Sequence, residues 1–118
     1  MATTVCRGGT GSESLYGGTG NDRLIGSGGN DYLSGGTGND TFVFAAGFSK
    51  DTIADFQNTN GVQDVIQFDK TVFADFSAVQ SHMAEVGTSV VITLDGNNTI
   101  EIQNMTSSQL HASDFLFV

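Results

Sequence analysis

The sequence predicts an all-β fold, in which a solenoid of short parallel strands is followed by a β-rich cap with one short helix. A nine-residue pattern repeats four times between residues 8 and 43 without an insertion. Most of the 16 glycines lie in this stretch, at fixed places within the repeat. Beyond residue 50 the period is lost, and short runs alternate apolar and polar residues as half-buried strands do. We therefore expect a repeat segment over residues 1–50 and a cap over residues 51–118, joined in one structural unit.

The four repeats agree position by position. Position 1 is Gly8, Gly17, Gly26 and Gly35, position 6 is Glu13, Asp22, Asp31 and Asp40, and position 8 is Leu15, Leu24, Leu33 and Phe42. Glycines at positions 1, 2 and 4 allow a tight turn with positive φ, which directs backbone carbonyls into the turn. The residue at position 8 is expected on a short strand with its side chain inward. Cys6 precedes Leu15 by nine residues, so it is expected in the same inward slot.

The acidic side chains are expected to stack in pairs. If each nonapeptide makes half a turn, two complete a coil, and loops 18 residues apart share an edge. Glu13 then lies on Asp31, and Asp22 lies on Asp40. At a strand spacing of about 4.8 Å the paired carboxylates repel each other. A calcium ion between them, with loop carbonyls completing a shell of roughly six to eight oxygens, removes that repulsion.

The repeat resembles the calcium-binding nonapeptide Gly-Gly-x-Gly-x-Asp-x-apolar-x of the RTX (repeat-in-toxin) family. The resemblance covers residues 8–43 and implies a right-handed parallel β-roll that holds calcium, on the order of two to four ions, between loops of one edge. One implied site uses Gly9, Gly11 and Glu13 with Gly26, Gly28 and Asp31. The other uses Gly18, Gly20 and Asp22 with Gly35, Thr37 and Asp40, and is expected to be the best formed.

Three positions depart from the repeat pattern. Glu13 is longer than the aspartate of the family, which affects occupancy of the first site. Ser27 replaces a glycine at position 2, and its backbone is expected to keep a negative φ. Asp51 follows Asp40 by 11 residues instead of nine and precedes Ile53 at the spacing found within the repeats. Asp51 either closes a third site against Asp31 or caps a turn.

The second half predicts ordinary strands and one helix. Strands are expected at 41–44, 52–56 and 64–68, a helix at 74–84 with Asp75 as N-cap, a hairpin at 89–94 and 99–103, a helical turn at 107–113, and a last strand at 115–118. This half covers the open end that a solenoid would otherwise expose. Residues 51–69 resemble the segment that follows the repeats in serralysin-type proteases and mannuronan epimerase modules. Asp114 and the four apolar residues after it resemble a type I secretion signal, and they fit a final core strand equally well.

Composition narrows the function classes. Thirteen acidic residues face four basic ones, for a formal net charge of −9. This charge disfavours nucleic acid and anionic membrane surfaces as partners and favours multivalent cations. No apolar run approaches the roughly 20 residues of a membrane span, and the single cysteine excludes an internal disulfide. The sequence has neither a nucleophile elbow nor a zinc-protease motif, and His82 and His111 are isolated and expected at the surface.

Three functions are consistent with these observations. The first is a non-enzymatic calcium-binding module of a secreted, extracellular bacterial protein. It folds on extracellular calcium and supports stability and type I secretion of a larger protein, whose export apparatus would contact the C-terminus. The second is a carbohydrate-binding accessory module for a polyuronate such as alginate. The third is the C-terminal part of a secreted enzyme whose catalytic domain lies elsewhere.

Overall fold

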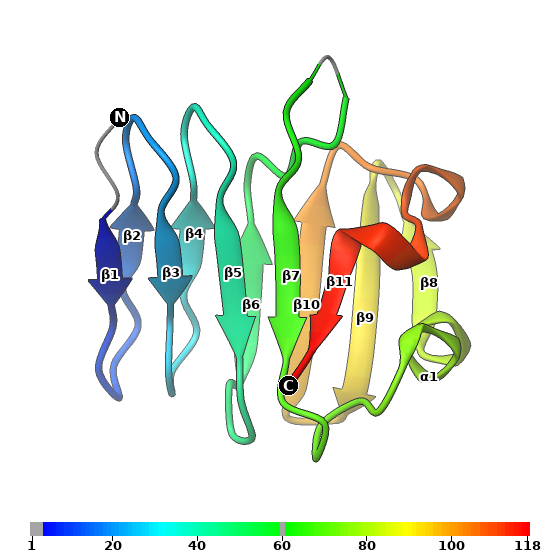
Figure 1. Ribbon diagram of the computed structural model, residues 1–118. Coiled ribbons are helices and arrows are strands. Elements are labelled where there is room, and N and C mark those ends of the chain that lie inside the picture. The colour runs from blue at the N-terminus through cyan, green and yellow to red at the C-terminus, as the bar shows by residue number, and fades with distance from the viewer. Residues whose placement is uncertain (1–3, 60) are drawn as a thin grey trace.

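The computed structural model describes residues 4–59 and 61–118, which form two facing β-sheets closed at one end by helices (Figure 1). Sheet A has the strand order β1 (Val5–Arg7), β3 (Arg23–Ile25), β5 (Thr41–Phe44), β7 (Val65–Phe68) and β11 (Phe115–Phe117). Sheet B has the order β2 (Ser14–Tyr16), β4 (Tyr32–Ser34), β6 (Lys50–Ile53), β10 (Asn98–Gln103), β9 (Ser89–Asp95) and β8 (Met83–Val86). The predicted all-β class is confirmed.

The repeats form the coils of a parallel β-roll. Successive strands alternate between the two sheets, and strands of one sheet pair in parallel, with Cys6 beside Leu24 and Leu24 beside Phe42. These pairs are 18 residues apart, as half-turn nonapeptides require. The turns lie along two edges (Figure 1). The upper edge carries loops 17–22, 35–40 and 54–64, and the lower edge carries loops 8–13, 26–31 and 45–49.

Position 8 of the repeat builds the core of the roll. Leu24, Leu33 and Phe42 are fully buried, and the partly buried Cys6 and Leu15 pack against the same core. Burial of one such aliphatic or aromatic side chain contributes roughly 1.5–3 kcal/mol. Each coil therefore gains a modest, repeated increment of stability, and the inward slot predicted for Cys6 is confirmed.

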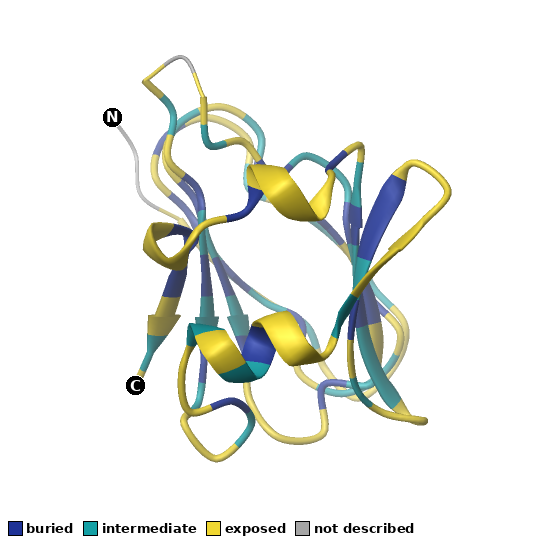
Figure 2. Cartoon of the chain, turned by 90° about the vertical axis from the view of Figure 1, so that its right-hand side faces the viewer, coloured by how far each residue is buried: buried dark blue, intermediate teal, exposed yellow. Residues whose placement is uncertain are grey.

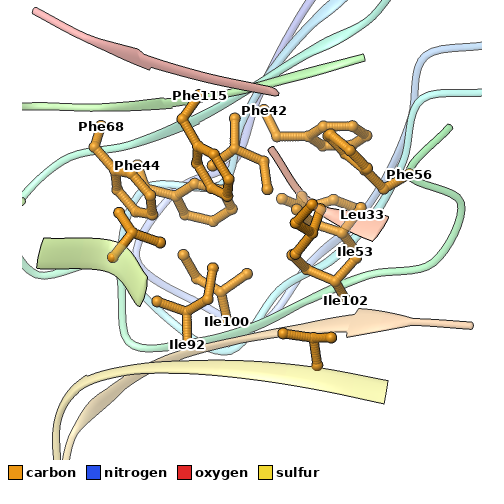
Figure 3. Close-up of a cluster of buried hydrophobic side chains, with 14 of the residues drawn as sticks. Leu33, Phe42, Phe44, Ile53, Phe56, Phe68, Ile92, Ile100, Ile102 and Phe115 are labelled. Atoms are coloured by element: carbon orange, nitrogen blue, oxygen red, sulfur yellow. The ribbon is translucent and has the colours of Figure 1, made fainter. Parts of the chain in front are cut away.

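Helices close the C-terminal end of the roll. Viewed from that end, α1 (Phe76–Ser81) and the 3-10 helices η1 (Ser107–Gln109) and η2 (Ala112–Asp114) lie across the space between the sheets (Figure 2). Beneath them is a cluster of aromatic rings (Figure 3). Phe68 is its centre, with ring centroids 5.0 Å from Phe73, 5.9 Å from Phe44 and 6.2 Å from Phe115. The predicted cap is thus a second, denser part of the core.

The helix predicted over 74–84 is shorter in the structure. Asp75 is the N-cap, as expected, and its carboxylate accepts a hydrogen bond from the backbone N–H of Ala78 at 2.9 Å. The helix ends at Ser81 because the chain turns there to form β8, which pairs antiparallel with β9. The prediction for 82–84 was therefore wrong, since edge pairing with β9 replaces helical hydrogen bonds.

Other boundaries also shift. The strand predicted at 52–56 is β6, which ends at Ile53 because Asp55 turns away to bond loop 35–40. The helical turn at 107–113 is split into η1 and η2. The last strand, β11, joins sheet A beside β7, and the backbone N–H of Val118 donates to the carbonyl of Phe68 at 3.1 Å. Sheet B runs through β6 into the cap, and the division at residue 50 stays a prediction.

Candidate calcium sites at the loop edges

The position-6 carboxylates form a ladder along each edge. On the upper edge the backbone N–H of Asp22 donates to Oδ1 of Asp40 at 3.0 Å. On the lower edge the N–H of Glu13 donates to Oδ1 of Asp31 at 2.9 Å, and the N–H of Asp31 donates to Oδ1 of Asp51 at 2.9 Å. Each acidic residue is thus held directly against the one in the preceding coil. The predicted stacking is confirmed, and Asp51 bonds the neighbouring coil as a position-6 residue does.

The second oxygen of these carboxylates has no partner. Asp22, Asp31, Asp40 and Asp51 are at most 3% exposed, and the Oδ2 atom of each accepts no hydrogen bond from residues 4–59 or 61–118. Leaving a buried acceptor unpaired costs about 1–3 kcal/mol, and more for a charged group. Native proteins rarely contain such atoms. Their recurrence at one position of the repeat indicates that a cation completes these carboxylates.

Glycine at position 1 makes room for oxygens from two coils. A methyl group on Gly17 would lie 2.6 Å from Oδ2 of Asp22 and 2.7 Å from the carbonyl oxygen of Gly35 in the next coil. A methyl group on Gly8 would likewise lie 2.5 Å from the carbonyl oxygen of Gly26 and 3.0 Å from Oε1 of Glu13. A carboxylate and a carbonyl therefore approach the same point between coils. Such oxygen-only surroundings fit calcium.

The remaining predicted ligands lie in the same loops, with different contacts. The carbonyl oxygens of Gly11 and Gly20 face Gly29 and Gly38 of the next coil so closely that a methyl group on either glycine would clash with them. The carbonyl of Gly18 already accepts a hydrogen bond from the N–H of Thr37 at 3.0 Å. The structure thus brings Gly11, Gly18 and Gly20 to the space between coils.

The other loop residues remain predicted ligands. The N–H of Gly9 donates to Oε1 of Glu13 at 3.1 Å, so the longer side chain bends back onto its own turn. Gly28 stacks beside loop 45–49, with the carbonyl oxygen of Gly47 3.9 Å from the place of its missing methyl group. Among the contacts of residues 4–59 and 61–118, none assigns the carbonyls of Gly9, Gly28 or Thr37 a role, so these three remain predictions.

Burial and mutual repulsion raise the pKa values of the stacked carboxyls. Burial is the main cause for Asp40 and Asp51, whose pKa values rise to about 7. The pKa of Asp31 is raised in the same direction, chiefly by burial and further by the charge of Glu13. A hydrogen bond from the preceding coil opposes the shift in each case. At neutral pH these groups therefore gain from a bound cation, which favours their charged form.

A second ladder, formed by asparagine, runs beside the carboxylates. Oδ1 of Asn21 accepts the N–H of Asn39 at 2.9 Å, and Oδ1 of Asn30 accepts the N–H of Lys50 at 3.1 Å. The N–H donors of these bonds lie in the later coil and the acceptors in the earlier one, opposite in sense to the aspartate bonds. The two ladders clamp adjacent coils reciprocally. The asparagine ladder was not predicted from the sequence, although asparagine recurs at position 5 of the repeat.

The expected negative φ at Ser27 is wrong. Its φ is +67°, close to the +85° of Gly18 and the +80° of Gly36 at the same position of neighbouring coils. The coil geometry therefore sets the backbone at position 2, and the serine adopts it at a cost of roughly 1–3 kcal/mol. Because the side chain of Ser27 is exposed, it meets no further obstacle.

Two aspartates outside the repeats also join the upper edge. Oδ1 of Asp64 accepts the N–H of Asp40 at 2.8 Å, 24 residues away instead of 18. Asp55 accepts the N–H groups of Gly35 and Gly36, each at 2.9 Å. The irregular spacing concealed both residues in the sequence. For Asp64 the sequence still held one indication, because Asp64 and Ile66 have the spacing of positions 6 and 8 of the repeat.

Other kinds of site find little support in the described residues. Across 4–59 and 61–118 no three acidic, histidine or cysteine side chains converge, so each cation site depends on backbone carbonyls besides two carboxylates. The same stretch holds no pocket. His82 and His111 are exposed. None of the helices described is long and apolar enough to cross a membrane.

Comparisons with known proteins agree with this geometry. No curated protein sequence matches the chain. Among solved structures, the extracellular lipase LipA from Serratia marcescens superimposes with a TM-score of 0.68 at 17% identity, over 97% of this chain. The match covers 21% of the lipase, so the chain spans about a fifth of its length, and the likeness concerns the fold. Residues 7–42 match the RTX calcium-binding nonapeptide repeat in four copies, and the chain is thus a β-roll protein with RTX calcium-binding repeats.

Proposed function

We propose that this chain is a non-catalytic module that folds when it binds extracellular calcium and thereby stabilises a larger exported protein. The observation that carries the proposal is the set of buried Oδ2 atoms of Asp22, Asp31, Asp40 and Asp51, none of which has a hydrogen-bond partner within the described residues. A chain without a bound cation leaves these charges uncompensated. Calcium binding to the folded loops adds its binding free energy to the free energy of folding.

The residues that would hold the ions follow from the ladders. Asp22 and Asp40 would hold one ion with the carbonyl of Gly35, and Glu13 and Asp31 would hold another with the carbonyl of Gly26. Asp31 and Asp51 would hold a third. Bound calcium supplies positive charge and accepts oxygen ligands without strict directional demands. The glycines at position 1 provide the space in which these oxygens meet.

Folding that depends on calcium suits a protein exported by a type I system. Where calcium is scarce, repulsion among the carboxylates keeps the repeats unfolded and able to pass through a channel. Millimolar extracellular calcium would then drive folding, in the affinity range of extracellular calcium modules. In the folded state the C-terminal residues form β11 within sheet A. A secretion signal there would be accessible before folding and paired with β7 afterwards.

Calorimetric titration with calcium, followed in parallel by circular dichroism, tests the proposal. Chelator-treated protein should bind several ions and gain β-sheet signal as it does so. Asp22→Asn is expected to lose an ion from the upper edge, whereas Asp95→Asn, in the exposed hairpin turn, should match the wild type. Failure of the wild type to bind calcium would refute the proposal, and so would binding with no change in structure.

A polysaccharide-binding accessory function has one observation in its favour. Arg7 and Arg23 project from the outer face of sheet A, where no acidic side chain projects from β1, β3, β5, β7 or β11. Arg23 reaches Gln67 with an Nη1–Oε1 distance of 3.4 Å, and within the described residues neither arginine forms an ion pair with a carboxylate. Guanidinium groups without acidic partners are suited to carboxylates of a bound polymer.

Alginate titration of the calcium-loaded module tests this second function. The wild type should release or absorb heat on binding, Arg7→Ala with Arg23→Ala should abolish the signal, and Lys70→Ala should retain it. An unchanged affinity of the double variant, or no binding by the wild type, would eliminate the outer face of sheet A as a polyuronate site.

A further inference from the structure

The loop over residues 54–64 reproduces the ligand end of a nonapeptide, although it lies outside the four repeats. The N–H of Gln63 donates to Oδ1 of Asn39 at 2.9 Å, as the N–H of Asn39 does to Asn21. The N–H of Asp40 donates to Oδ1 of Asp64 at 2.8 Å, as the N–H of Asp22 does to Asp40 at 3.0 Å. Gln63 and Asp64 therefore occupy positions 5 and 6 of a further coil.

The strand that follows continues this register. The N–H of Val65 donates to the carbonyl of Asp40 at 2.8 Å, as the N–H of Thr41 does to the carbonyl of Asp22 at 2.8 Å. Ile66 then lies beside Phe42 in sheet A, in the inward slot of position 8. The separation of 24 residues instead of 18 leaves six extra residues, and these are accommodated earlier in the loop.

Asp40 carries the atom that points to a ligand at this place. Its side chain is 1% exposed, and its Oδ2 atom accepts no hydrogen bond from the part of the chain that the structure describes. In the preceding coil, the corresponding Oδ2 of Asp22 lies with the carbonyl oxygen of Gly35 around Gly17, towards the following coil. By the same register, Oδ2 of Asp40 belongs to the space between loop 35–40 and loop 54–64.

Asp55 supplies a further negative charge to this end of the edge. Its Oδ1 accepts the N–H of Gly35, and its Oδ2 accepts the N–H of Gly36 and the hydroxyl of Ser34, at 2.8–2.9 Å. Asp55 thereby ties the irregular loop to the last nonapeptide. Asp40, Asp55 and Asp64 thus each bond a neighbouring loop at this end of the upper edge, and the entire chain has four basic residues to offset their charge.

We propose that Asp40 and Asp64 hold an additional calcium ion at the C-terminal end of the upper edge, beyond the nonapeptide repeats, with Asp55 as the residue that positions the loop around it. This inference rests on the proposed calcium-binding function. It adds a site that joins the last repeat to the cap. Asp64 keeps one lone pair on each oxygen for the ion, because each oxygen accepts a single N–H, from Asp40 and from Gln57.

Calcium stoichiometry of matched variants tests the additional site. Asp64→Asn retains an oxygen to accept the N–H of Asp40, and it is expected to bind one ion fewer than the wild type. Asp69→Asn is the control, because Asp69 lies just past the other end of β7 and, among the described residues, its carboxylate accepts hydrogen bonds from Thr71 alone. Circular dichroism in saturating calcium establishes that each variant is folded. Wild-type stoichiometry in Asp64→Asn would overturn the inference, whereas absence of binding in the wild type would refute the proposed function itself.

A crystallographic measurement decides the matter if Asp64→Asn does not fold. Crystals of the wild-type chain grown with terbium, which replaces calcium and scatters anomalously, should show a peak between Asp40 and Asp64. Peaks between the nonapeptide loops alone would exclude the additional site while leaving the repeat sites intact.

Discussion

The repeats and the cap bury aspartates in opposite ways. Asp114, in the cap, is 1% exposed, and its carboxylate accepts hydrogen bonds from Asn58 at 2.9 Å, Gln63 at 2.8 Å and the backbone of His111 at 2.7 Å. Asp22, in the repeats, is equally buried but has one oxygen without a partner among the described residues. The C-terminal part of the cap thus satisfies its buried charge with its own donors, whereas the stacked aspartates, including Asp51 at the start of the cap, leave theirs to a cation.

The apolar core is also sparser in the repeats than in the cap. Each repeat contributes one inward side chain per strand, such as Leu24 or Leu33, whereas the cap concentrates aromatic rings around Phe68 (Figure 3). A chain of this size has a net stability of roughly 5–15 kcal/mol. A few unpaired buried carboxylates, at about 1–3 kcal/mol each, are comparable to that total. The comparison therefore predicts a calcium-dependent region joined to a region that depends mainly on packing.

Removal of calcium should have the largest effect and should separate the two regions. With a chelator at neutral pH, amide protons of β3 and β4 are expected to lose protection from exchange by about 1,000-fold or more, as locally unfolded segments do. Amide protons of β9 and β10 should retain more of their protection. Hydrogen–deuterium exchange by NMR measures both. Equal loss in the two regions would show that the cap has no stability of its own.

Truncating a core side chain should destabilise the repeats less when calcium is in excess, whereas the cost of a truncation in the cap should not depend on calcium. Phe68→Ala is expected to cost about 3–5 kcal/mol with or without calcium, because its ring packs within the cap. Leu24→Ala is expected to cost about 2–5 kcal/mol, of which excess calcium should recover part through binding to the adjacent loops. Urea unfolding monitored by circular dichroism gives both values.

The control for this comparison is Leu116→Ala, which removes a side chain that is 47% exposed on β11. Surface truncations of this kind change stability by about 0.5 kcal/mol or less. If calcium failed to lessen the effect of Leu24→Ala relative to Phe68→Ala, the distinction between the two cores would be lost.

Lowering the pH should stabilise the calcium-free roll and weaken calcium binding. The folded-state pKa values of Asp40 and Asp51 are about 7 and that of Asp64 is about 6, all raised by burial above the usual value of 3.8. The unfolded chain releases these protons first, so the stability present at the lowest pH declines as pH rises from about 4 to 7. Calcium requires the deprotonated carboxylates, so its affinity should increase over the same range.

Urea unfolding at pH 5 and pH 8, in chelator and in saturating calcium, measures these opposite effects of pH. The midpoint should be higher at pH 5 without calcium and higher at pH 8 with saturating calcium. Identical midpoints at the two pH values in chelator would mean that the stacked carboxyls do not limit the stability of the roll.

The sequence was most informative where its period was intact. The pairing of Asp22 with Asp40 followed from half-turn repeats, because a fixed period specifies which loops share an edge. The spacing of Asp51 from Ile53 made it a candidate despite the broken period, with a turn cap as the alternative. Asp64 was missed because six extra residues separate it from Asp40, and only tertiary pairing restores the register. The strand β8 was missed for a similar reason, since Met83 continues the helical pattern of Phe76 and Val79.

The smallest expected effect concerns the backbone at Ser27. Because its φ is +67°, Ser27→Gly should relieve strain, and the gain is expected to be up to about 1 kcal/mol after the greater flexibility of the unfolded glycine chain is subtracted. The same change at Ser77, within α1, should instead cost about 0.5 kcal/mol, since glycine is less favourable than serine in a helix. Thermal unfolding in saturating calcium compares the two. A loss of stability in Ser27→Gly would indicate that the serine makes a compensating interaction in the calcium-bound loop.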